Sequence, residues 1–137
     1  MSKLLQRLQD PVRSGVYRVR RTDEVLEATR ASGLDVVTIS FTKNNTLIQA
    51  IASALQFPDW FGGNWDALED CLSDLSWRKA DGHVLLLENA AAGDELGILV
   101  DVLRSCAEFW SGRGKPFFAV FVDPQRVLPL ADLFRET

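Results

Sequence analysis

Residues 83–88 read HVLLLE, and they predict the architecture around which the 137-residue chain is built. The middle of this stretch is apolar without interruption, which indicates a strand covered on both faces. PFFAVFV at 116–122 predicts a further strand, the last of the core. A long helix over 93–110 separates the two, and its apolar stripe consists of Leu96, Leu99, Val100, Leu103, Ala107 and Trp110. Strands that alternate with helices predict a parallel sheet with right-handed crossovers.

The same alternation continues upstream. LDVVTISF at 34–41 is rich in β-branched residues and predicts a buried strand. A helix follows, closed by Pro58, because proline disfavours a helical conformation at the residue before it. Its apolar positions have helical spacing: Ile48, Ile51, Ala52 and Leu55. Asn64 is a natural N-cap for a further helix that we expect to run to about Leu75.

The first 33 residues predict a short arm, a strand and a helix. The strand is expected at 15–19, where the residues alternate. Thr22 opens the helix, in which Val25 and Leu26 would make apolar contacts, and Gly33 would close it as a C′ glycine. At the other end of the chain, a short helix is expected after Pro129.

These elements predict a small α/β domain, with a parallel β-sheet of three core strands plus an N-terminal fourth, packed with helices. The sequence contains no internal repeat, low-complexity tract or linker rich in proline, glycine or serine. We therefore expect one domain over residues 1–137, with a core at 34–123 and a strand–helix extension at 1–33.

The composition excludes several classes of protein. Hydrophobic residues make up 47% and charged residues 25%, as in ordinary globular proteins, so wholesale disorder is excluded. The longest apolar run, 117–122, is far too short to span a bilayer, and the N-terminus lacks the apolar region of a secretory signal. Two cysteines predict neither a disulfide framework nor a zinc site. We expect a cytoplasmic protein that binds no cofactor, no metal and no membrane.

The charge of the chain is unevenly distributed. Residues 57–110 contain eleven acidic residues against three lysines and arginines, whereas residues 1–43 contain five against eight. An acidic field of this kind repels nucleic acid and attracts a cationic partner. Such a charge can also simply keep a small protein soluble.

The acidity is concentrated in FPDWFGGNWDALEDCLSDL, residues 57–75. On the helix expected there, one stripe is apolar and consists of Trp65, Leu68, Leu72 and Leu75. The opposite side carries Asp66, Glu69, Asp70, Ser73 and Asp74. No lysine or arginine occurs in 57–77, so the acidic residues repel one another without an i, i+4 partner. A helix selected only for stability would carry a lysine here, which makes this side a candidate binding surface.

The preceding loop places aromatic residues beside these acids. Gly62 and Gly63 supply a sharp turn. Phe61 is expected in the core, whereas for Trp60 burial and exposure are equally compatible with the sequence. An exposed aromatic residue beside unpaired acids is typical of a binding hot spot for a basic partner.

Residues 58–72, PDWFGGNWDALEDCL, resemble the signature of the barstar-like family, the intracellular inhibitors of secreted microbial ribonucleases. The resemblance implies a barstar-like fold, and an immunity protein or antitoxin whose loop and helix plug the active site of a basic secreted ribonuclease or related toxin. It implies that Asp70 occupies the site of an RNA phosphate, that Asp66 pairs with basic residues nearby, and that Trp60 packs against the catalytic region. Glu108 is the candidate for an acidic residue that the family uses on its last helix. The predicted partner-binding residues are Trp60, Gly62, Asp66, Glu69, Asp70, Asp74 and Glu108, and we expect a monomer when the chain is free.

The chain departs from the family pattern at positions that bear on the partner. Glu69 stands where the best-known member has a large aromatic residue, and Asp74 and Leu75 replace a Gly–Trp pair at its interface. Residues 1–33 have no counterpart in the minimal family. These differences concern the identity of the partner more than the fold.

Two other functions fit less of the sequence. A barstar-like binding or regulatory protein with a non-ribonuclease partner would use the same acidic surface. A small α/β enzyme would place Glu88, Asn89 and Asp123 at the carboxyl ends of strands, where ligands bind. However, acids one helical turn apart on a convex surface, such as Asp66 and Asp70, make a poor cleft. His83, Cys71 and Cys106 are expected to be structural residues.

Overall fold

The structure is a computed structural model that describes residues 3–91 and 93–134. A five-stranded sheet runs through its centre in the order β2-β3-β4-β1-β5, and every neighbouring pair is parallel. The strands are β1 (Gly15–Val19), β2 (Asp35–Ser40), β3 (His83–Glu88), β4 (Phe117–Val122) and β5 (Ala131–Asp132). The predicted α/β fold with a parallel sheet is confirmed.

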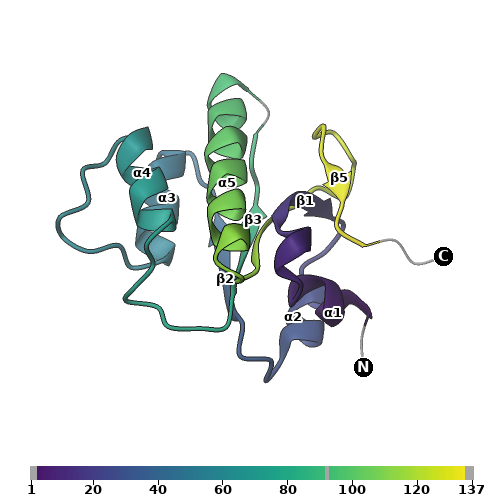
Figure 1. Ribbon diagram of the computed structural model, residues 1–137. Helices are drawn as coiled ribbons and strands as arrows, with labels where there is room; N and C mark the ends of the chain where they lie inside the picture. The colour runs from purple at the N-terminus through teal and green to yellow at the C-terminus, as the bar shows by residue number, and fades with distance from the viewer. Residues whose placement is uncertain (1–2, 92, 135–137) are drawn as a thin grey trace.

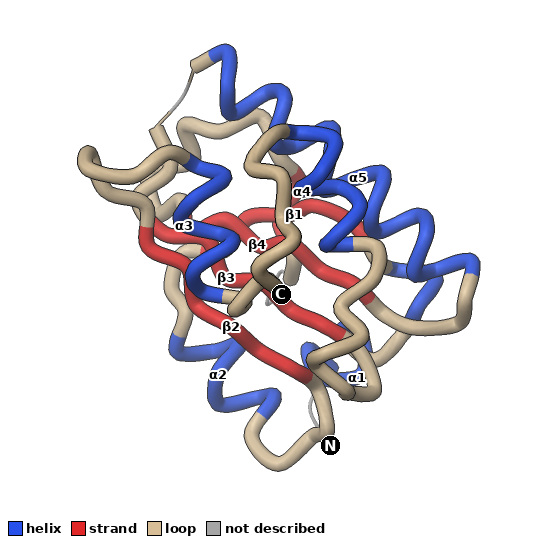
Figure 2. The backbone as a smooth tube through the Cα atoms, turned by 90° about the vertical axis from the view of Figure 1, so that its left-hand side faces the viewer, coloured by secondary structure: helices blue, strands red, loops and turns tan. Residues whose placement is uncertain are grey.

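Helices cover both faces of the sheet, which makes three layers (Figures 1 and 2). One face carries α3 (Leu47–Ala54), α4 (Trp65–Leu72) and α5 (Asp94–Gly112), and the other carries α1 (Lys3–Leu8) and α2 (Asp23–Thr29). A short 3-10 helix, η1 (Pro11–Arg13), leads into β1. Within the described part of the chain, no helix is both long and apolar enough to cross a membrane.

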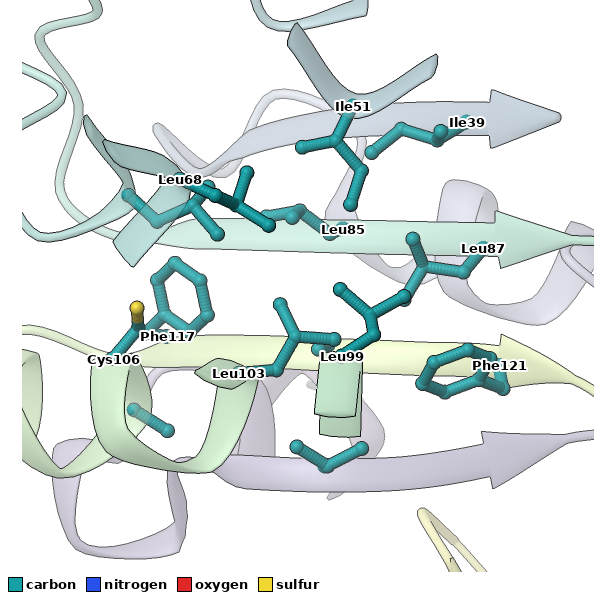
Figure 3. Packing of buried hydrophobic residues seen from close by; sticks show 14 of the residues in the cluster. Ile39, Ile51, Leu68, Leu85, Leu87, Leu99, Leu103, Cys106, Phe117 and Phe121 are labelled. Carbon is teal, nitrogen blue, oxygen red and sulfur yellow. The ribbon is translucent and has the colours of Figure 1, made fainter. Parts of the chain in front are cut away.

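The two central strands divide their side chains between two apolar clusters. Leu85 and Leu87 of β3 face α3, α4 and α5, together with Phe117 and Phe121 of β4 (Figure 3). The alternate residues of both strands pack in the second cluster, against α1 and α2: Val84, Leu86, Phe118 and Val120. Both strands are therefore buried on both faces, as predicted for 83–88, and the structure shows the same for 116–122.

The N-terminal strand lies inside the sheet rather than at its margin. β1 pairs with β4 along its whole length, from Gly15 beside Phe118 onward, and with β5 on its other side. Arg18 fastens this arrangement, since its Nε lies 2.8 Å from a carboxylate oxygen of Asp132 and its Nη1 donates to the Leu128 carbonyl. The predicted fourth strand exists, and it lies between two strands from the C-terminal part of the chain, β4 and β5.

Both ends of the chain differ from the prediction. The expected N-terminal arm contains helix α1, whose Leu4 and Leu8 are buried against the sheet. After Pro129 the chain forms β5 instead of the expected short helix, because Ala131 pairs with Tyr17 of β1. Pairing of this kind depends on residues far away in the sequence and overrides local preference.

β2 was predicted to be a buried strand, and this is wrong for most of its residues. Only Ile39 is fully buried, while Thr38 and Ser40 are exposed. The reason is its position at the margin of the sheet, where it has a neighbour on one side only.

Three helix details also differ. α2 ends at Thr29, so Gly33 lies in the following turn with a φ of +83° and does not close the helix. Within α2, Val25 is buried but Leu26 is exposed. α4 ends at Leu72, earlier than expected, and the chain then turns so that Leu75 is still buried.

Candidate protein-binding surface

The acidic helix α4 begins and packs as its sequence predicts. The side chain of Asn64 accepts a hydrogen bond from the Ala67 N–H at 2.7 Å and caps the helix N-terminus. Leu68, Cys71 and Leu72 are buried toward the sheet. The opposite face is exposed and carries Asp66, Glu69 and Asp70. Asp74, also exposed, follows in the turn after the helix.

None of these four carboxylates forms an ion pair with another residue in the described part of the chain. Asp74 accepts a hydrogen bond from the Ser76 hydroxyl at 3.3 Å. Arg78, the first basic residue after α4, is engaged elsewhere, because its guanidinium makes two hydrogen bonds to Asp35. No ion pair within the described chain therefore neutralises these four carboxylates.

The aromatic loop before α4 presents Trp60 to solvent. Its side chain is 64% exposed, which answers the question that the sequence left open. Its ring packs edge to face on the ring of Trp77, with 6.5 Å between the two ring centroids. Trp77 in turn donates a hydrogen bond from its indole N–H to the Leu55 carbonyl. Phe61 packs on the core, as predicted, and stacks edge-on against Phe57. Trp60 is thus exposed to solvent and packs against Trp77, whose position is fixed by a hydrogen bond.

The two glycines of this loop have different roles. Gly63 has a φ of +77°, a conformation that side-chain-bearing residues rarely adopt. Gly62 is not in that region, and a Cβ placed on it would lie 3.5 Å from Cβ of Ala67, an ordinary contact. Gly63 therefore makes the turn, while Gly62 lies against the first turn of α4.

Helix α5 holds α4 in place through polar contacts to its backbone. The Trp110 indole N–H donates to the Leu72 carbonyl at 2.8 Å. The Cys106 thiol lies 3.9 Å from the Glu69 carbonyl oxygen and accepts a weak hydrogen bond from Ser73. Burial raises the pKa of Cys106 to about 12, so this thiol is unreactive and serves packing.

Six of the seven predicted partner-binding residues lie together in residues 60–74: Trp60, Gly62, Asp66, Glu69, Asp70 and Asp74. The structure does not bring Glu108 to this surface. Cys106 faces α4, and Glu108 lies about 200° further around α5, so it is exposed on the side away from α4. Leu75, which replaces an interface residue of the best-known family member, is only 2% exposed and cannot contact a partner.

The sequence analysis missed a charged cluster that secures the segment after α4. Asp35 accepts hydrogen bonds from Arg78 at 2.7 and 2.9 Å, and His83 Nδ1 lies 3.2 Å from the same carboxylate. Burial raises the pKa of Asp35, but the hydrogen bonds and charges of Arg78 and His83 outweigh it and leave the pKa lowered. A lone aspartate at the start of a predicted strand gave no signal of this cluster.

Two buried polar residues, His83 and Asp123, make contacts within the fold. His83 is 3% exposed, and burial lowers its pKa despite the opposing effect of Asp35. Asp123 is buried and accepts hydrogen bonds from the backbone N–H groups of Val127 and Leu128. Among the described residues, no cluster of histidine, cysteine, aspartate and glutamate could hold a metal ion. The candidate site is the exposed acidic surface of α4 and the turn after it, with the exposed Trp60 beside it.

Comparison with known families identifies one family model that matches the chain. The model of a family described as Barstar (barnase inhibitor) matches residues 34–122, which is more than half of the chain. The match begins just before β2 and ends with β4, so α1, β1, α2 and β5 lie outside it. No curated protein and no solved structure matches the chain.

Proposed function

Because the chain belongs to the barstar family, we propose that it binds a ribonuclease toxin and blocks the active site of that enzyme. The binding surface consists of the loop and helix that carry Trp60, Gly62, Asp66, Glu69, Asp70 and Asp74. On this proposal the chain is no enzyme, but an immunity protein, or antitoxin, that acts in the cytoplasm.

The observation that carries the proposal is the set of exposed carboxylates on α4 that no described basic residue neutralises. A ribonuclease cleft binds the phosphates of RNA with arginine, lysine and histidine. Carboxylates on a rigid helix can take the places of those phosphates. In this arrangement Asp70 occupies a phosphate site, Asp66 pairs with basic residues beside it, and Trp60 packs on the catalytic region.

The way α4 is held favours tight binding. Its N-terminus is capped by Asn64, its buried face belongs to the core, and its last carbonyl is bound by Trp110. A surface that is ordered before association loses little conformational entropy on binding. The mutual repulsion of the acids, unfavourable in the free chain, would be relieved by a basic partner.

Titration calorimetry against a small secreted guanyl-specific ribonuclease tests the proposal, with RNA cleavage measured in parallel. We expect stoichiometric binding and loss of cleavage. Asp70→Ala should weaken binding by at least about a hundredfold, since it leaves a buried cation of the enzyme unpaired. Asp23→Ala is the matched control, because Asp23 is an exposed acid on α2, outside the surface. Equal affinity of the two variants would remove the assignment of Asp70.

A second candidate, a barstar-like protein with a non-ribonuclease partner, is favoured by one feature. Glu69 on α4 and Asp74 in the turn after it are exposed while Leu75 is buried, so these positions present carboxylates and no apolar side chain. If the ribonuclease does not bind, a basic toxin encoded beside this chain is the next protein to titrate. Binding through this surface should weaken as the salt concentration rises.

A further inference from the structure

The strand β2 leaves one side of its backbone without a partner. The Asp35 N–H donates to the Gly82 carbonyl and the Phe41 N–H donates to the Glu88 carbonyl. The backbone N–H and C=O groups of the odd-numbered residues of β2 therefore point toward β3. The backbone groups of Val36, Thr38 and Ser40 therefore point away from the sheet. No described residue forms a hydrogen bond with their N–H groups. Thr38 and Ser40 are exposed, so this margin is open to solvent.

The opposite margin of the sheet is protected. β5 is only two residues long, and its Asp132 is paired with Arg18 and Arg126. Short length and charged side chains are devices by which proteins keep sheet margins from pairing with other chains. In β2 the single charged residue, Asp35, stands at the start of the strand and is paired with Arg78. Residues 36–42 contain no charged residue and no proline, and the pairing with β3 is continuous.

The segment that follows the start of β2 carries little charge. Residues 36–58, which contain the rest of β2 and all of α3, include a single charged residue, Lys43, in a chain that is 25% charged. The exposed side chains on α3 are uncharged polar groups such as Gln49 and Ser53. In a two-fold contact centred on Thr38, that residue meets its own copy and Val36 meets Ser40, so none of the paired positions brings like charges together. A neutral margin therefore suits a second copy of this chain better than the basic partner of α4.

We propose that the chain forms a homodimer in which the β2 strands of two copies pair in antiparallel fashion about a two-fold axis at Thr38. Thr38 then lies opposite Thr38 of the second copy and exchanges both backbone hydrogen bonds with it. Val36 lies opposite Ser40 of the second copy, and one continuous sheet crosses both molecules. This dimer goes beyond the proposed inhibitory function, does not depend on it, and differs from the monomer that the sequence analysis expected.

Light scattering on the intact chain, from micromolar to millimolar concentration, tests the dimer. We expect the mass of the wild type to double over this range. Thr38→Lys brings two like charges together at the axis and should weaken dimerisation by at least about tenfold. Because Thr38 is exposed, the lysine fits the folded monomer, which circular dichroism verifies. Ala131→Lys, on the exposed position of β5, is the matched control and should dimerise like the wild type.

Amide hydrogen exchange locates the contact directly. In the wild type, protection of the Val36, Thr38 and Ser40 amides should rise with protein concentration, and in Thr38→Lys it should not. The proposal is overturned if the wild type stays monomeric at millimolar concentration. It is also overturned if a dimer forms while these three amides remain unprotected. If the wild type stays monomeric and Thr38→Lys loses affinity for the ribonuclease, the margin binds that partner instead of a second copy.

Discussion

The indole N–H of Trp110 lies 2.8 Å from the carbonyl oxygen of Leu72, in the buried seam between α5 and α4. Leu72 is the last residue of α4, and the last carbonyls of a helix have no partner within it. A side chain of α5 thus donates a hydrogen bond to the last carbonyl of α4, which no backbone N–H of the helix can reach. The orientation of the carboxylates toward solvent depends in part on this hydrogen bond.

Trp110→Phe should lower the free energy of unfolding by about 1–3 kcal/mol, because the buried Leu72 carbonyl loses its donor. Urea denaturation measures the change. Trp60→Phe is the control, since Trp60 is exposed, and its effect should stay within about 0.5 kcal/mol. Equal destabilisation by both substitutions would show that the hydrogen bond contributes nothing measurable.

Asp70→Ala should make the free chain more stable, by about 0.5–1 kcal/mol. Alanine is the better helix former, and the substitution removes the repulsion between Asp70 and Asp66 one turn earlier. Thermal unfolding at low and high salt separates the contribution of helix propensity from that of charge repulsion, because the repulsion weakens as the salt concentration rises. A variant less stable than the wild type would assign Asp70 a structural role.

The two loop glycines should respond differently to alanine. Gly63→Ala forces a side chain into a left-handed conformation and should cost about 1 kcal/mol of stability. Gly62→Ala meets only an ordinary contact and should unfold with the wild-type midpoint. Parallel urea titrations compare the two. If Gly62→Ala then binds the ribonuclease more weakly, the loss reflects contact with the partner rather than a damaged fold.

His83 should make the stability of the chain depend on pH near neutrality. Its pKa is lowered from 6.5, chiefly because burial disfavours the imidazolium. Asp35 is ionised at neutral pH and can only accept a hydrogen bond, so Nδ1 of the neutral ring carries the proton that points to it. Between the lowered pKa and 6.5 the unfolded chain binds more protons than the folded chain, so stability rises with pH.

Urea denaturation at pH values on both sides of 6.5 should therefore show the wild type losing stability as the pH falls through this window, with full stability above it. The chain contains one histidine, so His83→Gln removes the effect without a second histidine to complicate the comparison. The same slope in both proteins would contradict the prediction. Arg78 and Lys115 also face His83 and oppose its protonation.

The sequence predicted the elements whose signals are local. The strands β3 and β4, the two-face burial of β3, the Asn64 cap and the burial of Leu68 and Leu72 on α4 were predicted correctly, because strand burial and helix capping leave marks within a few residues. Most of the proposed surface could be read in the same way, since the unpaired acids of α4 lie within a dozen residues of one another.

The features that the sequence did not predict depend on contacts between distant segments. β5 forms because Tyr17 and Arg18 lie beside it, and nothing within residues 129–134 indicates a strand. The burial of β2 was overestimated because its β-branched residues fit the margin of a sheet as well as its centre. Asp35, Arg78 and His83 come together only once β2 and β3 are paired.

The position of β1 between β4 and β5 bears on how the chain is made. The Phe117 N–H donates to the Ser14 hydroxyl at 2.9 Å, across 103 residues of sequence. On the ribosome β1 is synthesised well before β4 and β5, the two strands that pair with it, since 103 residues of sequence separate Ser14 from Phe117. The nascent chain must therefore carry a strand with two unpaired sides while β2, β3 and the helices are synthesised. Such late closure slows folding and lengthens the time during which the strand is open to aggregation.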